Sequence, residues 1–425
     1  MKALKISTLV ICGLLSQTSF AQEFEANIQL RPRFEMRNGY KNPLSNGQNP
    51  AAFVSQRSRL NLNFAKEKLD VKLSLQNVSS WGDVPTSTPK SKNGVAIYEA
   101  WARYKFTPKF SLKAGRQVIA YDNQRIFGEI DWAQQGQSHD ALVFTISPKN
   151  HKIDLGAALN SDAETLIQTA YTVPTYKTMQ FLHYTTDIKA FKINLLAVNV
   201  GYEYVKPDLS LKIDYSQTYG TYLVYKKDKL NANLSVYGQS GTKSNKVVAA
   251  YNAGANIGYD IAKSWNLALG YEYLSGKSQA DSSGNIKSFQ PLFGTNHGFN
   301  GFMDYFYVGN HQNSVGLQDA YLKLNFKKGK WNTSLVPHVF YSAEPIIDSL
   351  AQKMDSYLGT EFDFTIAYAF QSDFVVTAGY SQMLGTKSME RIKGGNVART
   401  TNWAYVALSF SPSIFSYKKE VKPLE

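Results

Sequence analysis

Residues 23–37 alternate strictly between polar or charged side chains and apolar ones. The odd positions are Glu23, Glu25, Asn27, Gln29, Arg31, Arg33, Glu35 and Arg37, and the even positions are Phe24, Ala26, Ile28, Leu30, Pro32, Phe34 and Met36. Because successive side chains of a strand point to opposite faces, this stretch predicts a β-strand with one charged and one apolar face. A soluble sandwich would expose the charged face to bulk water. The rest of the sequence favours the reverse geometry, with the apolar face toward lipid and the charged face around a water-filled pore.

Amphipathic stretches of this kind recur along the whole chain. We predict strands at 23–37, 54–66, 69–79, 95–107, 110–117, 139–147, 151–160, 176–184, 190–200, 217–226, 229–238, 249–260, 264–275, 315–326, 331–341, 357–370, 373–384 and 401–410. The connections alternate between short turns and long loops, the long ones being 38–53, 80–94, 118–138, 161–175, 201–216, 239–248, 276–314, 342–356 and 385–400. Short turns on one rim and long loops on the other are typical of outer-membrane barrels. The fold class predicted is therefore all-β: a transmembrane antiparallel β-barrel of about 18 strands, with short periplasmic turns and long extracellular loops.

The N-terminus has the features of a secretory signal peptide. Lys2 and Lys5 precede the apolar run 6–15, and a Ser-Phe-Ala sequence ends at Ala21, after which we predict cleavage. The only cysteine, Cys12, lies inside this segment, so the mature chain would have neither disulfides nor thiolate metal ligands. The predicted organisation is a signal peptide at 1–21, a barrel at 22–410 and a C-terminal tail at 411–425.

The mature chain is basic. Removing the two lysines of the signal peptide lowers the formal charge from +13 to +11. A signal peptide directs the chain away from nucleic acid, so outer-membrane lipid headgroups and anionic solutes are the expected partners. A Lys or Arg facing lipid at mid-membrane costs about 2–4 kcal/mol, so the charged rows are expected to face the lumen. The predicted lumen wall contains Arg31, Arg33, Arg57, Arg59, Lys72 and Arg103, partly offset by Glu23, Glu25, Glu35 and Glu99.

Several segments from Ser55 onward match the pattern of a known family. They are SQRSRLNLNF (55–64), LQNVSSWGD (75–83), YEAWARYKF (98–106), KAGRQVIAYDNQRIFGEIDW (113–132), HGFNGFMDYF (297–306) and GLQDAYLKL (316–324). Through them the chain resembles the alginate export family of outer-membrane barrels. The resemblance implies a monomeric barrel with an electropositive lumen that passes an anionic polysaccharide outward. The family's motif positions are occupied by Arg57, Arg59, Glu99, Arg116, Gln117, Arg125, Trp132 and Asp304.

Arg116 has two interpretations. Strict alternation from Lys113 would turn Arg116 toward lipid, unless it lies above the membrane at the rim or a bulge at Gly115 re-aims it inward. Its planar guanidinium group suits a polyanion, but an internal ion pair with Glu129, Asp131 or Asp140 is an equally good expectation.

Other candidate chemistry is weaker. Glu129 and Asp131 beside Trp132 resemble a glycosidase carboxylate pair, but two carboxylates in one loop do not establish the separation that such chemistry requires. The six histidines have no metal-ligand spacing, although His297 and His311 share a long loop. We expect no metal and no cofactor. The aromatic residues near predicted strand ends favour an interfacial girdle, and they are Tyr98, Tyr104, Tyr202, Tyr204, Tyr222, Tyr225, Tyr271, Tyr273, Tyr380 and Trp403.

The functional expectation is a passive outer-membrane channel for anionic or polar solutes, an anionic polysaccharide such as alginate among them. The substrate path would comprise Arg31, Arg33, Arg57, Arg59, Glu99, Arg103, Arg116, Arg125, Trp132 and Asp304. The alternative is a barrel enzyme acting on lipid or polysaccharide, for which the sequence shows no Ser/His pair or suitably spaced carboxylates. An energised importer is disfavoured because the mature chain would begin directly with a strand. Whether loop 276–314 closes the pore is left open.

Overall fold

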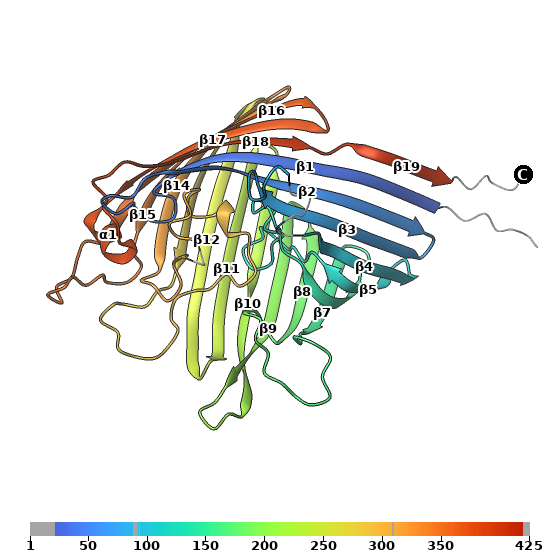
Figure 1. The fold of residues 1–425 in the computed structure, drawn as a ribbon, viewed down its shortest axis with the longest axis horizontal. Coiled ribbons are helices and arrows are strands. Elements are labelled where there is room, and N and C mark those ends of the chain that lie inside the picture. The colour runs from blue at the N-terminus through green and yellow to red at the C-terminus, as the bar shows by residue number, and fades with distance from the viewer. Residues whose placement is uncertain (1–21, 88–91, 93, 308–309, 420–425) are drawn as a thin grey trace, which may run out of the picture.

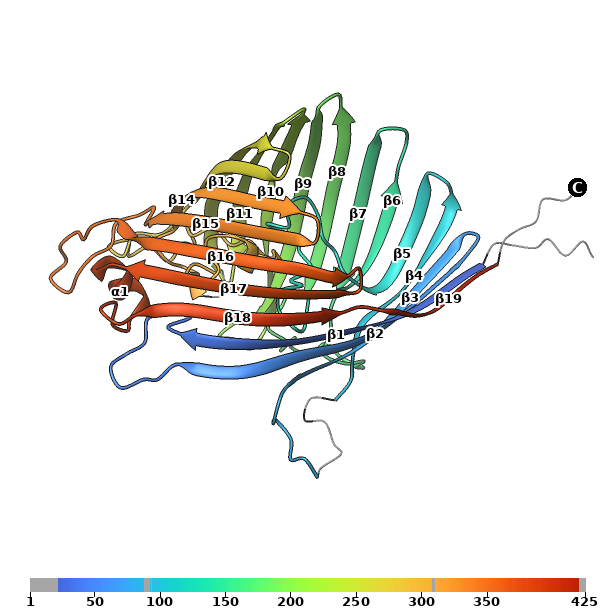
Figure 2. The same cartoon turned by 90° about the horizontal axis from the view of Figure 1, so that it is seen from above.

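A computed structural model describes residues 22–87, 92, 94–307 and 310–419 as one closed antiparallel β-barrel (Figures 1 and 2). The predicted signal peptide, 1–21, lies outside the described residues. Each strand pairs with its neighbours in the chain, and β1 pairs with both β2 and the last strands, which closes the sheet. The predicted fold class is confirmed. The strands are β1 (Gln22–Asn38), β2 (Ala51–Lys66), β3 (Leu69–Ser80), β4 (Ala96–Thr107), β5 (Phe110–Gln117), β6 (His139–Ile146), β7 (His151–Leu159), β8 (Thr178–Ile188), β9 (Phe191–Val205), β10 (Leu211–Lys227), β11 (Leu230–Lys243), β12 (Lys246–Ala262), β13 (Trp265–Leu274), β14 (Leu317–Lys328), β15 (Trp331–Tyr341), β16 (Tyr357–Gln371), β17 (Phe374–Gly385), β18 (Thr401–Phe410) and β19 (Ser413–Lys419).

Two strands in succession, β18 and β19, occupy the last position in the barrel sheet, next to β1. Both pair with β1, β18 along its second half and β19 along its first, with a register shift between Ala26 and Asn27. Pro412 separates them and has no backbone N–H to continue the ladder. The wall therefore extends beyond Phe410, where the sequence placed its end, and residues 413–419 of the predicted tail are part of the sheet. The alternation of Phe415 and Tyr417 with polar residues was the available signal.

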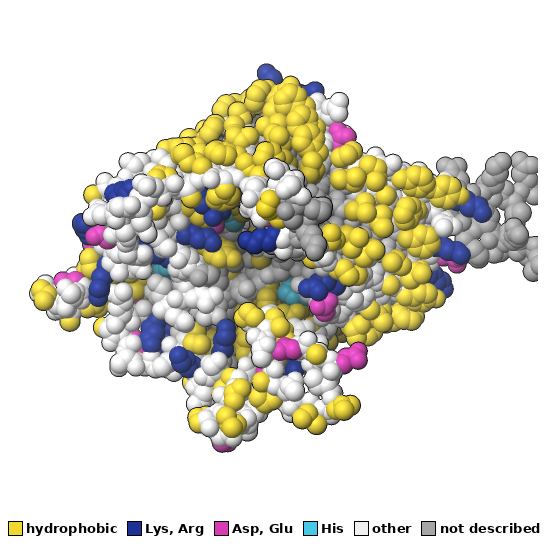
Figure 3. All heavy atoms as spheres, in the orientation of Figure 1, with side chains coloured by type: hydrophobic (Ala, Val, Ile, Leu, Met, Phe, Trp, Pro, Cys, Tyr) yellow, Lys and Arg dark blue, Asp and Glu magenta, His cyan; other side chains and the backbone are white. Residues whose placement is uncertain are grey.

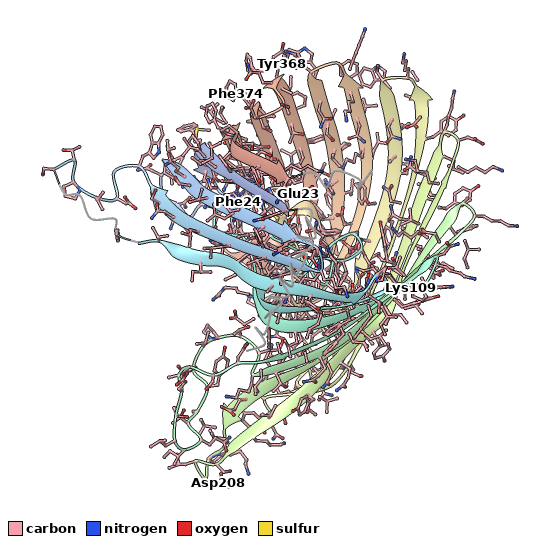
Figure 4. All side chains as sticks on the ribbon, turned by 90° about the vertical axis from the view of Figure 1, so that its right-hand side faces the viewer. Glu23, Phe24, Lys109, Asp208, Tyr368 and Phe374 are labelled. Atoms are coloured by element: carbon pink, nitrogen blue, oxygen red, sulfur yellow. The ribbon has the colours of Figure 1, made fainter. Side chains whose placement is uncertain are left out.

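Two of the predicted long loops are largely β-structure. Strands β9 and β10 extend into a hairpin joined by residues 206–210, and β11 and β12 are joined by Ser244 and Asn245 alone. Both of these turn residues have positive φ (49° and 61°), which matches the right-handed twist of a two-residue hairpin. Asp208, at the tip of the β9–β10 hairpin, projects from one edge of the barrel in Figure 4. The part of a strand that projects past the apolar belt does not contact lipid and needs no apolar face. Its sequence therefore lacks the amphipathic alternation and was predicted as a loop.

The outer face of the barrel is apolar. Side chains that alternate with the charged rows are exposed along each strand, as with Ile28 and Phe34 on β1, which are 40% and 44% exposed. Large hydrophobic patches cover the outside of the barrel in Figure 3. A surface of this extent, unusual for a soluble protein, is the one expected to contact lipid.

Aromatic rings form a continuous row along part of the rim that carries the short turns. Trp331, Tyr368, Phe370, Phe374 and Phe410 contact one another in that order, with successive ring centroids 4.6, 4.7, 5.0 and 4.5 Å apart. Figure 4 shows Tyr368 and Phe374 close together at this edge. Such a belt is where amphipathic rings meet the membrane–water interface.

Several aromatic residues predicted for the girdle lie inside the barrel instead, Tyr202 among them. Trp403 is fully buried, Tyr98 is 5% exposed, and Tyr222 lies on the inward face of β10, where it lines a cavity. A register shift between β3 and β4 turns both Tyr98 and Glu99 inward, because the extra residue of a bulge breaks the alternation. Others, such as Tyr104 and Tyr380, do lie exposed on the outer face.

Candidate functional site

Two long loops, 118–138 and 275–316, fold into the barrel and contact each other. Phe127 and Phe293 form a parallel bridge, with Gly128 N donating to Phe293 O at 2.9 Å and Phe293 N donating to Ile126 O at 3.0 Å. In Figure 1 coil segments occupy the space inside the ring of strands. The loops therefore narrow the interior, and the groups that hold them define the candidate site.

The first group, called here the arginine arc, consists of Arg31, Arg33 and Arg37 on β1 with Arg57 and Arg59 on β2. Arg31 and Arg57 are directly opposite each other in the ladder, a destabilising pairing of like charges. Asp131 of loop 118–138 relieves it, since one carboxylate oxygen lies 3.2 Å from Arg31 Nη1 and the other 2.8 Å from Arg57 Nη2. Arg33 Nη1 also donates to Trp132 O at 2.7 Å. The arc thus anchors the loop.

Asp131 remains ionised in this setting. Burial by itself raises the pKa of its carboxyl, but the charges of Arg57 and Arg31 outweigh burial, and the pKa lies below its ordinary value. Both arginines are mostly shielded, with side chains 0% and 11% exposed, whereas that of Asp131 is 49% exposed.

The arginine arc keeps an excess of positive charge. Glu35 pairs with Arg33 at 3.0 Å and with Arg37 at 2.8 Å, so together with Asp131 two carboxylates serve five guanidinium groups. Arg59 has no carboxylate partner among the described residues; it donates to Gln76 Oε1 at 2.8 Å and lies 3.6 Å above the centre of the Tyr98 ring. In Figure 3 Lys and Arg side chains gather around a hollow near the middle of the visible face.

A cavity of about 470 Å³ adjoins the arc. Its wall combines basic groups with polar and aromatic ones from loops 39–50, 118–138 and 275–316. Its lining includes Arg33, Arg37, Lys41, Ser55, Trp132, His297, Asp304 and Tyr307. We call this the first cavity.

Trp132 and Asp304, separated by 172 positions in the chain, meet at the first cavity through His297. The ring of Trp132 stacks on that of His297, with centroids 4.4 Å apart and planes 12° apart. His297 Nδ1 lies 2.8 Å from Asp304 Oδ1, and the Tyr40 hydroxyl donates to the other oxygen of Asp304. Trp132 also packs edge-on against Trp403. Two of the predicted path residues therefore share one cluster.

The remaining predicted path residues are dispersed. Glu99 pairs with Lys72, and Arg103 pairs with Asp70 at 2.6 Å, both on inward faces nearer the short turns. Arg116 lies on the outer face beside Asp140, 3.7 Å away, which corrects its assignment to the substrate path: alternation holds through Gly115 and no bulge re-aims it.

Arg125 lies inside the barrel and pairs with groups outside the arginine arc. Its side chain is 1% exposed, and its Nε forms an ion pair with Glu272 on β13 at 2.9 Å. Its Nη2 donates to Asn300 Oδ1 at 3.0 Å. It therefore joins loop 118–138 to loop 275–316 and to strand β13.

The wall formed by β13 to β16 carries a second buried charged cluster, which the sequence reasoning missed. It consists of Glu272 on β13, Asp319 on β14 and Glu361 and Asp363 on β16, with His338 on β15, and we call it the acidic wall. Glu361 and Asp363 are 0% and 1% exposed. All lie on inward-facing positions of predicted strands, so the alternation itself was the signal that could have found them.

The acidic wall holds loop 275–316 by its backbone. Met303 N donates to Glu361 Oε1 at 2.7 Å, and Phe302 N donates to Asp363 Oδ2 at 3.0 Å. Gly301, with φ of +85°, lets the chain approach this closely, because a Cβ there would lie 2.6 Å from Glu361 Oε2. Beside this contact lies a second cavity of about 330 Å³, between loop residues 298–302 and strands β10 to β15.

No group of three His, Cys, Asp or Glu suited to a metal ion occurs among the described residues. His311 is half-buried, and desolvation together with nearby Lys393 lowers its pKa to about 3. None of the helices in the described part of the chain is long and apolar enough to cross a membrane.

Comparison with known proteins gives the following relationships. The sequence model of a family described as alginate export matches residues 22–384. Solved structures similar to this chain include OccAB4 of Acinetobacter baumannii (TM-score 0.63, 11% identity, covering 92% of this chain and 98% of that one). OpdK of Pseudomonas aeruginosa, determined with vanillate, has a TM-score of 0.61 at 10% identity and the same coverage. At this identity the likeness concerns the fold. No curated protein matches the chain.

Proposed function

Since this chain belongs to the alginate export family and is a porin-like channel of the Gram-negative outer membrane, we propose that anionic and polar solutes cross it past the arginine arc. Anionic polysaccharides such as alginate belong to this class, because the planar guanidinium group matches a carboxylate with two parallel hydrogen bonds. The path would comprise the arginine arc together with Trp132 and Asp304 at the first cavity.

The observation that supports this proposal is the unbalanced charge of the arc. Two carboxylates serve five guanidinium groups there, whereas Glu99 and Arg103 each have an oppositely charged partner nearby. Inside a narrow, low-dielectric passage an excess of one sign raises the local concentration of the opposite ion. Solute carboxylates would exchange with the internal partners of the arc.

The test is ion selectivity in a planar bilayer with a salt gradient. The reversal potential of the unmodified channel should show anion preference, and Arg59→Gln should reduce it, because Arg59 contributes charge without anchoring a loop. The matched control is Arg116→Gln, which removes the same charge from the outer face and should leave the potential unchanged. Cation preference in the unmodified channel would refute the proposal.

We further infer that the channel is a monomer without catalytic activity. The closed barrel supports the first point, since the sheet formed by the described strands has no free edge for another copy to extend. The engagement of Asp131 by two arginines argues against its use with Glu129 as a catalytic pair. Mass measurement in detergent would test the monomer, and turnover of phospholipid or uronate polymers would revive the enzyme alternative.

A further inference from the structure

The second cavity differs in chemistry from the first. Its wall is made largely of amide, hydroxyl and aromatic side chains from adjacent inward faces of the barrel and from the inserted loop. Those that matter here are Tyr222, Asn233, Asn256, Phe299, Tyr321 and Lys323. A few polar groups converging on a concave, partly aromatic surface are typical of small-molecule sites.

Several of these polar groups have unused hydrogen-bonding capacity. Within the part of the chain that the structure describes, the Tyr222 hydroxyl, the Asn233 amide and the Lys323 ammonium group make no hydrogen bond or ion pair. Asn256 Nδ2 donates only to the Tyr321 hydroxyl, at 3.3 Å, which leaves that hydroxyl's proton available. These groups are half-buried or exposed to the cavity rather than sealed in the wall. They offer donors and acceptors to whatever enters.

The carboxylates of the cavity, by contrast, are already engaged. Glu272 pairs with Arg125 at 2.9 Å, and Asp319 accepts a hydrogen bond from His338 Nδ1 at 2.8 Å. Asn300 Nδ2 lies 2.7 Å from Glu272 Oε2 and 3.1 Å from Asp319 Oδ2, and so bridges them. With Arg125 and Lys323 opposing the two carboxylates, the cavity carries no excess of either sign. Lys323 is the one charged group of this lining without an ion pair among the described residues, so the cavity offers a single free cation, whereas the arginine arc has three more guanidinium groups than carboxylates.

We propose that the second cavity is a subsite for an uncharged, hydroxylated ring such as a hexose unit. Hydroxyl groups both donate and accept, which matches the free amide and phenol groups of Asn233, Tyr222 and Tyr321. Phe299 and Phe302 supply apolar surface for the C–H face of the ring. The subsite rests on the channel function proposed above and adds a solute class to it. Charged solutes would follow the arginine arc, while neutral sugar units pause at the second cavity.

The test uses single-channel recording with glucose and maltotriose as uncharged probes. Entry of a sugar into the subsite should interrupt the ion current for resolvable periods. Tyr222→Phe, which removes only the hydroxyl, and Asn233→Ala should each shorten these interruptions about two- to tenfold, as expected for losing one hydrogen bond. Asn231→Ala is the matched control, because Asn231 lies on the same inward face of β11 without lining the cavity.

The outcomes separate the subsite from the channel function. Anion-selective current that neither sugar interrupts would overturn the subsite and leave the channel proposal intact. Equal shortening by Asn231→Ala and Asn233→Ala would also overturn it, since the effect would then be unspecific. Should Asn233→Ala fail to insert into bilayers, Tyr222→Phe decides alone, because it preserves the ring and its packing.

Discussion

The arginine arc, on β1 and β2, and the acidic wall, on β13 to β16, are two charged clusters of one barrel, and they hold the inserted loops with opposite chemistry. On the arc, guanidinium groups bind a carboxylate and a carbonyl of loop 118–138, namely those of Asp131 and Trp132. On the wall, carboxylates bind backbone N–H groups of loop 275–316. Each strand cluster is tolerated because a loop supplies the opposite polarity.

The two clusters differ in what remains after the loops are bound. The carboxylates of the acidic wall contact backbone N–H groups, Asn300, His338 and Arg125, and one oxygen of Glu361 is buried without a hydrogen-bond partner. The arginine arc shares two carboxylates among five guanidinium groups and keeps positive charge. The carboxylates of the acidic wall are buried against loop 275–316, whereas the arginine arc adjoins the first cavity, where its excess charge can meet a solute.

Among the variants that test this difference between the two clusters, Asp131→Ala is expected to have the largest effect on how firmly a loop is held. Arg31 and Arg57 would face each other with no shared carboxylate, and loop 118–138 would lose its main anchor. Removing one partner of a buried pair costs more than removing an exposed one, and because Asp131 is half exposed we expect about 2–3 kcal/mol in favour of loop opening. Conductance should rise, and proteolysis within the loop should accelerate.

The control for this variant is Glu129→Gln in the same loop, since the Glu129 side chain makes no hydrogen bond or ion pair among the described residues. Unchanged proteolysis of Asp131→Ala would show that the arginine arc does not hold the loop.

A smaller effect is expected at the acidic wall from Glu361→Ala. The N–H of Met303 would lose its acceptor, at a cost of about 1–2 kcal/mol to the local closed state. Hydrogen exchange of the Met303 amide should become about 5- to 30-fold faster. Glu361→Gln keeps a side-chain acceptor and should preserve most of the protection, so equal exchange in the two variants would contradict the proposed contact.

The smallest effect is the response to acid, which should involve loop 118–138 through Asp131. The pKa of Asp131 lies below its ordinary value in the folded loop, so its charge stabilises the loop above about pH 4, and this contribution is lost as the pH falls. Conductance should therefore rise on acidification below about pH 4. The same titration of Asp131→Asn should be flatter, and an identical response would assign the pH dependence to other groups.

Much of the barrel follows from local alternation. The faces of β1 and β2, the strand spans and the division into short and long connections all depend on neighbouring residues. They agree with the structure except at strand ends and at the predicted loops 201–216 and 239–248, which are largely strand. Two further differences from the predicted strands arise from a bulge and from a proline, which the alternation pattern does not take into account. The bulge at Tyr98 interrupts the alternation of inward and outward side chains on β4. Pro412 separates β18 from β19, which both pair with β1.

The sequence by itself determined a lipid-embedded sheet with charged inner rows, because a period of two needs no knowledge of distant residues. Only the tertiary structure decided which of the inward charges form ion pairs and hydrogen bonds with the inserted loops. Asp131 reaches Arg31 across 100 positions, and Asn300 joins Glu272 to Asp319. Such pairings depend on how the loops enter the barrel, and loop paths are set by long-range contacts that leave no periodic trace in the chain.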